Sequence, residues 1–150
     1  MPIPYTYDGP RTSITVERAF PGVAPERLFD AWVTPEQAAQ FLFTTKTSKT
    51  RYELDVREGG RYKITRQSSG KVYVAEGEYR EIARPQRLIF TFGMPQFAAD
   101  FDTVTVEITS DGAGGSHLKL TEEEMRPGYE KGTISGWKKM LELLAKALAG

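Results

Sequence analysis

The end of the chain carries a helical pattern of apolar residues, from Lys131 to Ala149. On a helical wheel one arc holds the apolar side chains Ile134, Trp137, Met140, Leu141, Leu144 and Leu148. The opposite arc holds the polar side chains Lys131, Ser135, Lys138, Glu142 and Lys146. This period predicts an amphipathic helix. Because such a helix gains most of its stability by burying its apolar side, the rest of the chain must supply a surface for it.

One strand and two short helices are predicted before residue 44. Residues 13–20 alternate apolar and polar side chains, which is typical of a half-buried strand. Leu28, Phe29 and Trp32 follow at helical spacing. Thr34 is the expected N-cap of a second helix, because the proline after it is well tolerated at a first helical position. We expect that helix to end near residues 41–43.

Residues 51–124 change to a period of two, as in Tyr52, Leu54 and Val56, which we expect to face inward. Glycine-containing turns at residues 58–60, 68–70 and 111–115 separate about six strands. Short connections predict an antiparallel meander, and the last helix would cover its apolar face. Residues 44–50 are polar and have two interpretations, a solvated loop or the rim of a binding cavity.

Length and charge narrow the class of protein. With 150 residues and 39% hydrophobic composition, the chain predicts one domain over residues 13–150 after an irregular lead-in at residues 1–12. The 20 basic and 20 acidic residues give no electrostatic reason to expect nucleic acid or membrane insertion. The sequence has no cysteine, which excludes disulfides and suits a reducing cytoplasm, the location we expect.

Metal, cofactor and nucleophile motifs are absent from the sequence. His117 is the only histidine, so a His/Cys metal cluster is excluded and no metal is expected. No serine lies in a Gly-x-Ser-x-Gly elbow, and no glycine-rich phosphate loop precedes a helix, so we expect no cofactor.

The carboxylates are the remaining candidates for catalysis. The two-residue period directs Glu53 and Asp55 to solvent, but it leaves the direction of Glu76 and Glu78 open. A carboxylate inside an apolar cavity would have a raised pKa and could act as an acid or a base. We interpret residues 122–124, three glutamates in a row, as a solvated strand end.

Aromatic side chains are numerous for one small core, and they have two interpretations, plain packing or the lining of a cavity. Methionine suits a cavity wall because it adapts its shape. The candidate ligand-binding residues are Trp32, Phe41, Phe43, Tyr62, Tyr73, Phe92, Phe97, Met125, Trp137 and Met140.

Four segments in order carry a resemblance to a known family. They are Phe20 to Trp32 followed by Thr34-Pro35-Glu36, then Asp55 to Tyr62, then Gly77 to Ile82 with Pro85 to Leu88, and last Gly136-Trp137 in the leucine-rich helix. The chain after residue 12 thus resembles the AHSA1 domain family, named after an activator of the Hsp90 ATPase, within the START-like (SRPBCC) superfamily.

The resemblance implies an α+β helix-grip fold, in which a curved antiparallel sheet of six to seven strands wraps the C-terminal helix around a cavity. The aromatic excess around that expected cavity, without a catalytic set, favours non-enzymatic binding of a small hydrophobic or aromatic molecule there. Two alternatives stay open. One is a protein-interaction module of the stress response, with a chaperone partner or a homodimer, that uses an exposed patch at residues 95–101. The other is a cyclase- or hydrolase-like enzyme that uses a buried Glu76 or Glu78.

Overall fold

The computed structural model describes residues 7–45 and 48–149. The strands are β1 (Thr12–Phe20), β2 (Lys49–Leu54), β3 (Arg61–Ser68), β4 (Lys71–Ala83), β5 (Arg87–Phe92), β6 (Asp102–Ser110) and β7 (Ser116–Met125). The helices are α1 (Pro25–Val33), α2 (Pro35–Ala38) and α3 (Glu130–Leu148). The element order is therefore the predicted one, with two short helices after the first strand and a long helix at the end.

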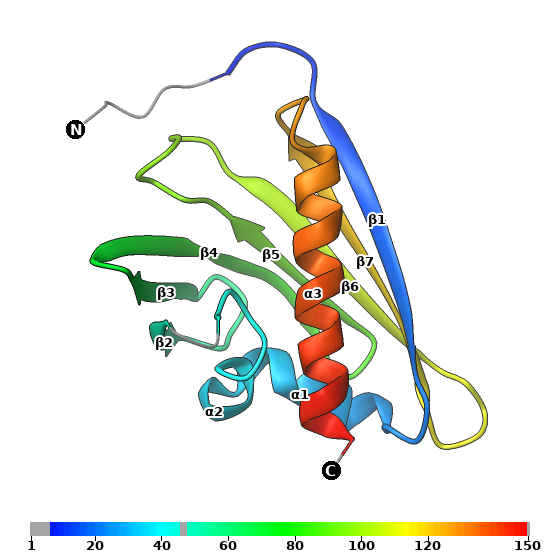
Figure 1. The fold of residues 1–150 in the computed structure, drawn as a ribbon. Helices are drawn as coiled ribbons and strands as arrows, with labels where there is room; N and C mark the ends of the chain where they lie inside the picture. The colour runs from blue at the N-terminus through cyan, green and yellow to red at the C-terminus, as the bar shows by residue number, and fades with distance from the viewer. Residues whose placement is uncertain (1–6, 46–47, 150) are drawn as a thin grey trace.

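All seven strands form one antiparallel sheet in the order β1-β7-β6-β5-β4-β3-β2. The chain runs back and forth from β2 to β7, and β1 then adds to the edge beside β7. The sheet curves around α3, which lies across its concave face, while α1 and α2 close one end (Figure 1). This is the predicted helix-grip architecture.

The core lies between the concave face of the sheet and α3. Trp137, Leu141 and Leu144 on the helix are at most 2% exposed, and Leu118 and Leu120 of β7 are fully buried. Burying a side chain of this size stabilises the fold by about 1.5–3 kcal/mol relative to leaving it in water. The predicted apolar arc of the last helix is therefore its buried side. None of the described helices is both long and apolar enough to cross a membrane.

Thr34 is the N-cap residue of α2, as expected, although its hydroxyl donates to the carbonyl oxygen of Asp30 at 2.7 Å instead of capping the helix. Two local expectations were wrong. Helix α2 ends at Ala38 rather than near residues 41–43. Val56 is 41% exposed rather than buried, because β2 ends at Leu54 and the Arg57 N–H already turns back to the Asp55 carbonyl oxygen at 2.9 Å.

The two irregular segments are shorter than predicted. The expected loop at residues 44–50 overlaps β2, which begins at Lys49, and its residues 46–47 lie outside the described residues. The lead-in overlaps β1, which begins at Thr12, and its residues 1–6 also lie outside the described residues.

Candidate functional site

A hollow of about 220 Å³ lies between the sheet and the first turns of α3. We call it the acidic pocket. Its lining comes from the end of β5, the β5–β6 loop, β6, β7 and α3, and comprises Phe92, Gly93, Met94, Phe97, Ala98, Asp100, Asp102, Glu122, Met125, Arg126, Tyr129 and Thr133. Gly93 is required where the loop leaves β5, because a Cβ there would lie 2.7 Å from the Phe101 ring.

Two carboxyl groups, Asp102 and Glu122, face each other in this pocket. Asp102 precedes the inward-facing Val104 by two residues, and Glu122 follows the inward-facing Leu120 by two, so both point to the concave face. The Trp137 Nε1–H donates a hydrogen bond to Glu122 Oε1 at 2.8 Å. Burial, with a smaller contribution from neighbouring Glu122, raises the pKa of Asp102 to about 9. The Asp102 carboxyl is therefore protonated at neutral pH and can act as a hydrogen-bond donor.

A third carboxylate, Asp100, fixes the loop that covers the acidic pocket. The Arg126 guanidinium binds Asp100 with two nitrogens, one of them Nε at 3.1 Å, and Arg11 Nη1 reaches Asp100 Oδ2 at 2.6 Å. The hydrogen bond from Arg126 is the main reason that the pKa of Asp100 lies far below its ordinary value. The β5–β6 loop is thereby held to the β7–α3 connection and to the segment before β1.

A second hollow, of about 490 Å³, lies on the other side of α3, toward β2 and β3. We call it the basic pocket. Its lining comes from the segment after α2, from β3 and from α3, and comprises Phe43, Thr44, Thr45, Arg66, Gly136, Lys139, Met140, Glu142 and Leu143. The two threonines belong to the loop for which a cavity rim was one of the two interpretations.

An aromatic wall of Phe43, Phe92 and Trp137 separates the two pockets. The Phe43 and Phe92 rings stack with centroids 4.9 Å apart, and Phe43 meets the Trp137 ring edge-on at 5.6 Å. Phe43 belongs to the basic pocket and Phe92 to the acidic one. The Phe43 backbone is left-handed, with φ 53°, and its N–H donates to the Met140 Sδ at 3.4 Å.

The middle of the concave face is filled by side chains. Trp32 meets Phe41 edge-on at 5.0 Å, and Tyr62 meets Phe90 edge-on at 5.7 Å. The hollow that remains among these residues is about 10 Å³. That is close to the smallest volume, roughly 10–15 Å³, that can hold one water molecule.

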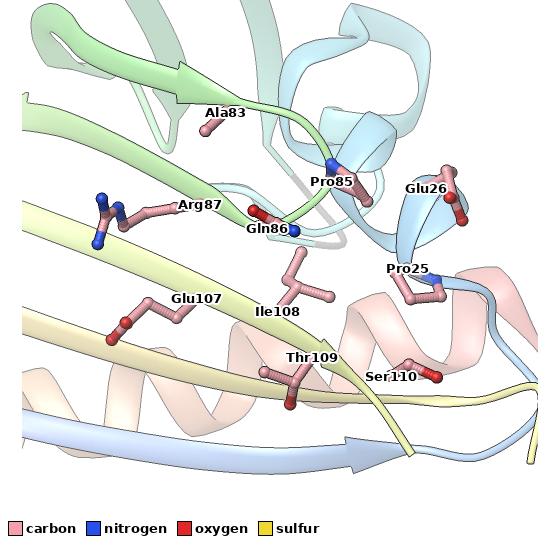
Figure 2. A pocket seen from close by; sticks show the side chains of 10 residues that line it. All are labelled: Pro25, Glu26, Ala83, Pro85, Gln86, Arg87, Glu107, Ile108, Thr109 and Ser110. Atoms are coloured by element: carbon pink, nitrogen blue, oxygen red, sulfur yellow. The ribbon is translucent and has the colours of Figure 1, made fainter. Parts of the chain in front are cut away.

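Another hollow, of about 680 Å³, lies at the end of the sheet beside the start of α1 (Figure 2). The β4–β5 turn, the end of β6 and Pro25 surround it. Its Arg87 guanidinium is already paired with Glu81, at 2.5 Å from Nε to Oε2. None of the ten candidate residues lines this hollow, and its polar side chains are exposed or half-exposed.

The ten candidate residues do not surround one cavity. Phe92, Phe97 and Met125 line the acidic pocket, and Phe43 and Met140 line the basic pocket. Trp32, Phe41 and Tyr62 pack in the filled core, Trp137 lies in the aromatic wall, and Tyr73 packs 6.3 Å from the ring of Phe97. The structure thus divides the expected cavity into two pockets.

Among the candidate carboxylates Glu122 differs from the sequence-based expectation, and the two whose direction was left open are partly exposed. Glu76 is paired with Arg61 at 3.5 Å and Glu78 with Arg80 at 2.8 Å, and both side chains keep substantial exposure. Glu122 is not solvated, because it is only 3% exposed. Its place in the alternation after Leu118 and Leu120 would have shown its direction. The same alternation, through Tyr62 and Ile64, would have shown that Arg66 faces α3.

Three single candidates outside the pockets, His117, Glu53 and Asp55, lie at the surface as expected. His117 is partly exposed at the surface, where its Nε2 lies 2.7 Å from Glu17 Oε1. Glu53 and Asp55 both point to solvent. No group of three or more acidic or histidine side chains within residues 7–45 and 48–149 is arranged to hold a metal ion.

Comparison with known proteins gives one family and many solved structures. The family model described as "Activator of Hsp90 ATPase homolog 1-like protein" matches residues 22–149. A Chromobacterium violaceum structure is 23% identical, with TM-score 0.82 over 92% of this chain and 98% of the other. A Staphylococcus aureus protein of unknown function is 24% identical, with TM-score 0.81 over 93% and 94%.

An AHSA1-like protein from Aeromonas hydrophila is 18% identical, with TM-score 0.75 over 92% of both chains. These structures confirm the helix-grip fold. No curated protein matches the chain.

Proposed function

The chain belongs to the Activator of Hsp90 ATPase homolog 1-like family, and from this premise we propose that it binds a small, mostly apolar molecule in the acidic pocket. The observation that carries the proposal is the pairing of half-buried Asp102 with buried Glu122 in a hollow that the apolar side chains of Phe92, Phe97 and Met125 also line. Binding sites for small molecules commonly combine an apolar lining with a few placed polar groups.

The volume of the pocket sets the size of the ligand. An engineered cavity of about 150 Å³ in another protein holds benzene, so 220 Å³ suits one substituted aromatic ring. The carboxyl pair sets its polarity. A hydroxyl or amino group on the ring can donate to Glu122 or accept from protonated Asp102, whereas a carboxylate ligand would meet the negative charge of Glu122.

Three ligands of similar size test this prediction, namely phenol, toluene and benzoate. We expect phenol to bind more tightly than toluene, and benzoate to bind most weakly. The readout is NMR of the methionine methyl groups, because Met94 and Met125 line the acidic pocket and Met140 lines the basic one. Saturable shifts of Met94 and Met125 support the proposal, and flat titrations with all three ligands contradict it.

A pair of substitutions on α3 locates the binding. Thr133→Trp places a large ring in the acidic pocket and should abolish the phenol response. Ser135→Trp is the matched control, because Ser135 is exposed on the same helix and lines neither pocket. Equal phenol affinity in both variants would place the binding elsewhere.

A second candidate function is stimulation of an Hsp90-type ATPase, as the description of the family suggests. It is favoured by three exposed aromatic side chains near the acidic pocket, Phe97 at 57%, Phe101 at 39% and Tyr129 at 62% exposure. Exposed apolar groups of this kind mark interaction surfaces. We expect the purified protein to raise the ATP turnover of purified Hsp90, and a Phe97→Ser, Phe101→Ser variant to lose the effect. An unchanged turnover with the wild-type protein removes this candidate.

A further inference from the structure

Arg66 is a cation on the concave face of the sheet that lacks an acidic partner among the described residues. Six other arginines between residues 51 and 87 form ion pairs, namely Arg51, Arg57, Arg61, Arg80, Arg84 and Arg87. Arg66 instead lies over the ring of Tyr73, with its guanidinium carbon 4.8 Å from the ring centroid. Its Nε is buried and has no hydrogen-bond partner in the described part of the chain.

This arginine lines the basic pocket, and the pocket has one excess positive charge. Among the described residues, Arg66 and Lys139 are the two cations of the lining and Glu142 is its one carboxylate. Glu142 Oε1 already lies 3.3 Å from Lys146 Nζ, one turn further along α3. An anion with a single charge therefore balances the pocket.

The other side of the basic pocket is apolar. Phe43, Met140 and Leu143 form this side, and all three are half-buried side chains that pack against the hydrophobic core. The volume of about 490 Å³ falls within the usual range for small-molecule sites, about 300–1,000 Å³. A ligand here needs an apolar body to cover these side chains and an anionic head to reach Arg66.

We propose that the basic pocket is a second binding site, for a monocarboxylate with an apolar tail, whose carboxylate pairs with Arg66 while the tail packs on Phe43, Met140 and Leu143. The guanidinium presents parallel N–H donors that match the two oxygens of a carboxylate. Stacking on Tyr73 holds the guanidinium plane in place. The basic pocket shares no lining residue with the acidic pocket.

Three ligands with the same tail and different heads test the charge requirement, namely octanoate, 1-octanol and octylammonium at pH 7. Octanoate should bind about tenfold more tightly than octanol, and octylammonium should bind more weakly than both. The readout is the Met140 methyl resonance, with Met125 as the internal reference for the acidic pocket. Octanoate that binds no better than octanol, or that shifts Met125 and leaves Met140 unchanged, overturns the proposal.

Substitutions of arginine test the residue. Arg66→Met should weaken octanoate about tenfold and leave octanol within about twofold, and Arg66→Lys should fall between Arg66→Met and the wild type. Arg51→Met is the matched control, since Arg51 is exposed on the neighbouring strand β2 and lines neither pocket.

Equal losses for octanoate and octanol in Arg66→Met would indicate a packing role for Arg66 and overturn the proposal. The comparison of head groups in the wild-type protein decides the matter even where the variant does not fold. Because phenol reports through Met94 and Met125, failure of the acidic pocket to bind is distinguishable from failure of this site.

Discussion

The two pockets beside α3 share one helix and one aromatic wall, but they satisfy their charged groups in different ways. In the acidic pocket Asp100 is bound by Arg126 and Arg11, and Glu122 accepts a hydrogen bond from Trp137. In the basic pocket the Arg66 guanidinium lies over the Tyr73 ring and has no acidic partner among the described residues. The difference teaches that one pocket is electrostatically complete without a ligand, whereas the other is not.

The contrast also concerns protons. Asp102 avoids the cost of a second buried negative charge by keeping its proton, because burial and the nearby Glu122 both disfavour its ionised form. Arginine cannot become neutral in this way, since its guanidinium stays protonated at any pH that proteins tolerate. The acidic pocket therefore responds to pH, and the basic pocket responds to anions.

The largest expected effect is on the helix that both pockets share. Leu144→Ala removes a side chain that is 1% exposed and should lower the free energy of unfolding by roughly 2–5 kcal/mol. Urea denaturation measures it, with Lys146→Ala on the exposed side as the control at about 0.5 kcal/mol or less. A loss below about 0.5 kcal/mol for Leu144→Ala would contradict the packing of α3 on the sheet.

A smaller effect is expected from the Trp137–Glu122 hydrogen bond, which belongs to the acidic pocket and not to the basic one. Trp137→Phe keeps an aromatic ring in the wall but removes the N–H that binds Glu122, which should lower the free energy of unfolding by about 1–3 kcal/mol. The affinity of the basic pocket for octanoate should stay within about twofold, because Arg66 is untouched. Equal losses of phenol affinity and octanoate affinity would show that Trp137 acts by packing in the aromatic wall rather than through its hydrogen bond to Glu122.

The smallest expected effect is a change of pH dependence. Asp102 has a pKa of about 9 in the folded protein against an ordinary value of 3.8, so the native state holds a proton that the unfolded chain releases. The stability from this group is full below about pH 4 and is lost as the pH rises toward 9. Asp102→Asn cannot ionise and should remove a change of about 1.4 kcal/mol between pH 6 and 7, the equivalent of one proton released over one pH unit.

Denaturation at several pH values measures this difference between the two profiles. His117→Asn is the control, because it removes only the exposed pair with Glu17, worth about 0.5 kcal/mol, and leaves Asp102 unchanged. A profile of Asp102→Asn parallel to that of the wild type would show that Asp102 is already ionised at pH 5.

The fold was predictable from the sequence because two periods determine which side chains are buried. The spacing of Trp137, Leu141 and Leu144 identified the buried side of α3, and the alternation in β6 and β7 identified the concave face. The period does not show where a strand ends, as Val56 illustrates. Strand β2 ends at Leu54, so Val56 lies in the following turn and is exposed.

The site was less predictable, because it depends on partners that are distant in sequence. Three consecutive glutamates suggest solvent, yet Glu122 follows Leu118 and Leu120 onto the concave face and is buried there. The partner that satisfies it, Trp137, lies fifteen residues later and could not be read from the strand alone. Aromatic residues were correctly singled out as abundant, but their number does not say whether they enclose a hollow or fill it. The side chains around Trp32 and Tyr62 fill nearly all the space between them and leave a hollow of only about 10 Å³, which the sequence pattern does not reveal.

The stacked rings of Phe43 and Phe92 couple ligand binding in the acidic pocket to ligand binding in the basic pocket. Each ring lines one pocket and packs against the ring that lines the other, so a ligand that displaces either ring changes the volume of the other pocket. Linkage then requires that the factor by which the first guest changes the affinity for the second equals the factor in the reverse direction. A titration of octanoate in the presence and absence of phenol, and the converse titration, must give the same ratio.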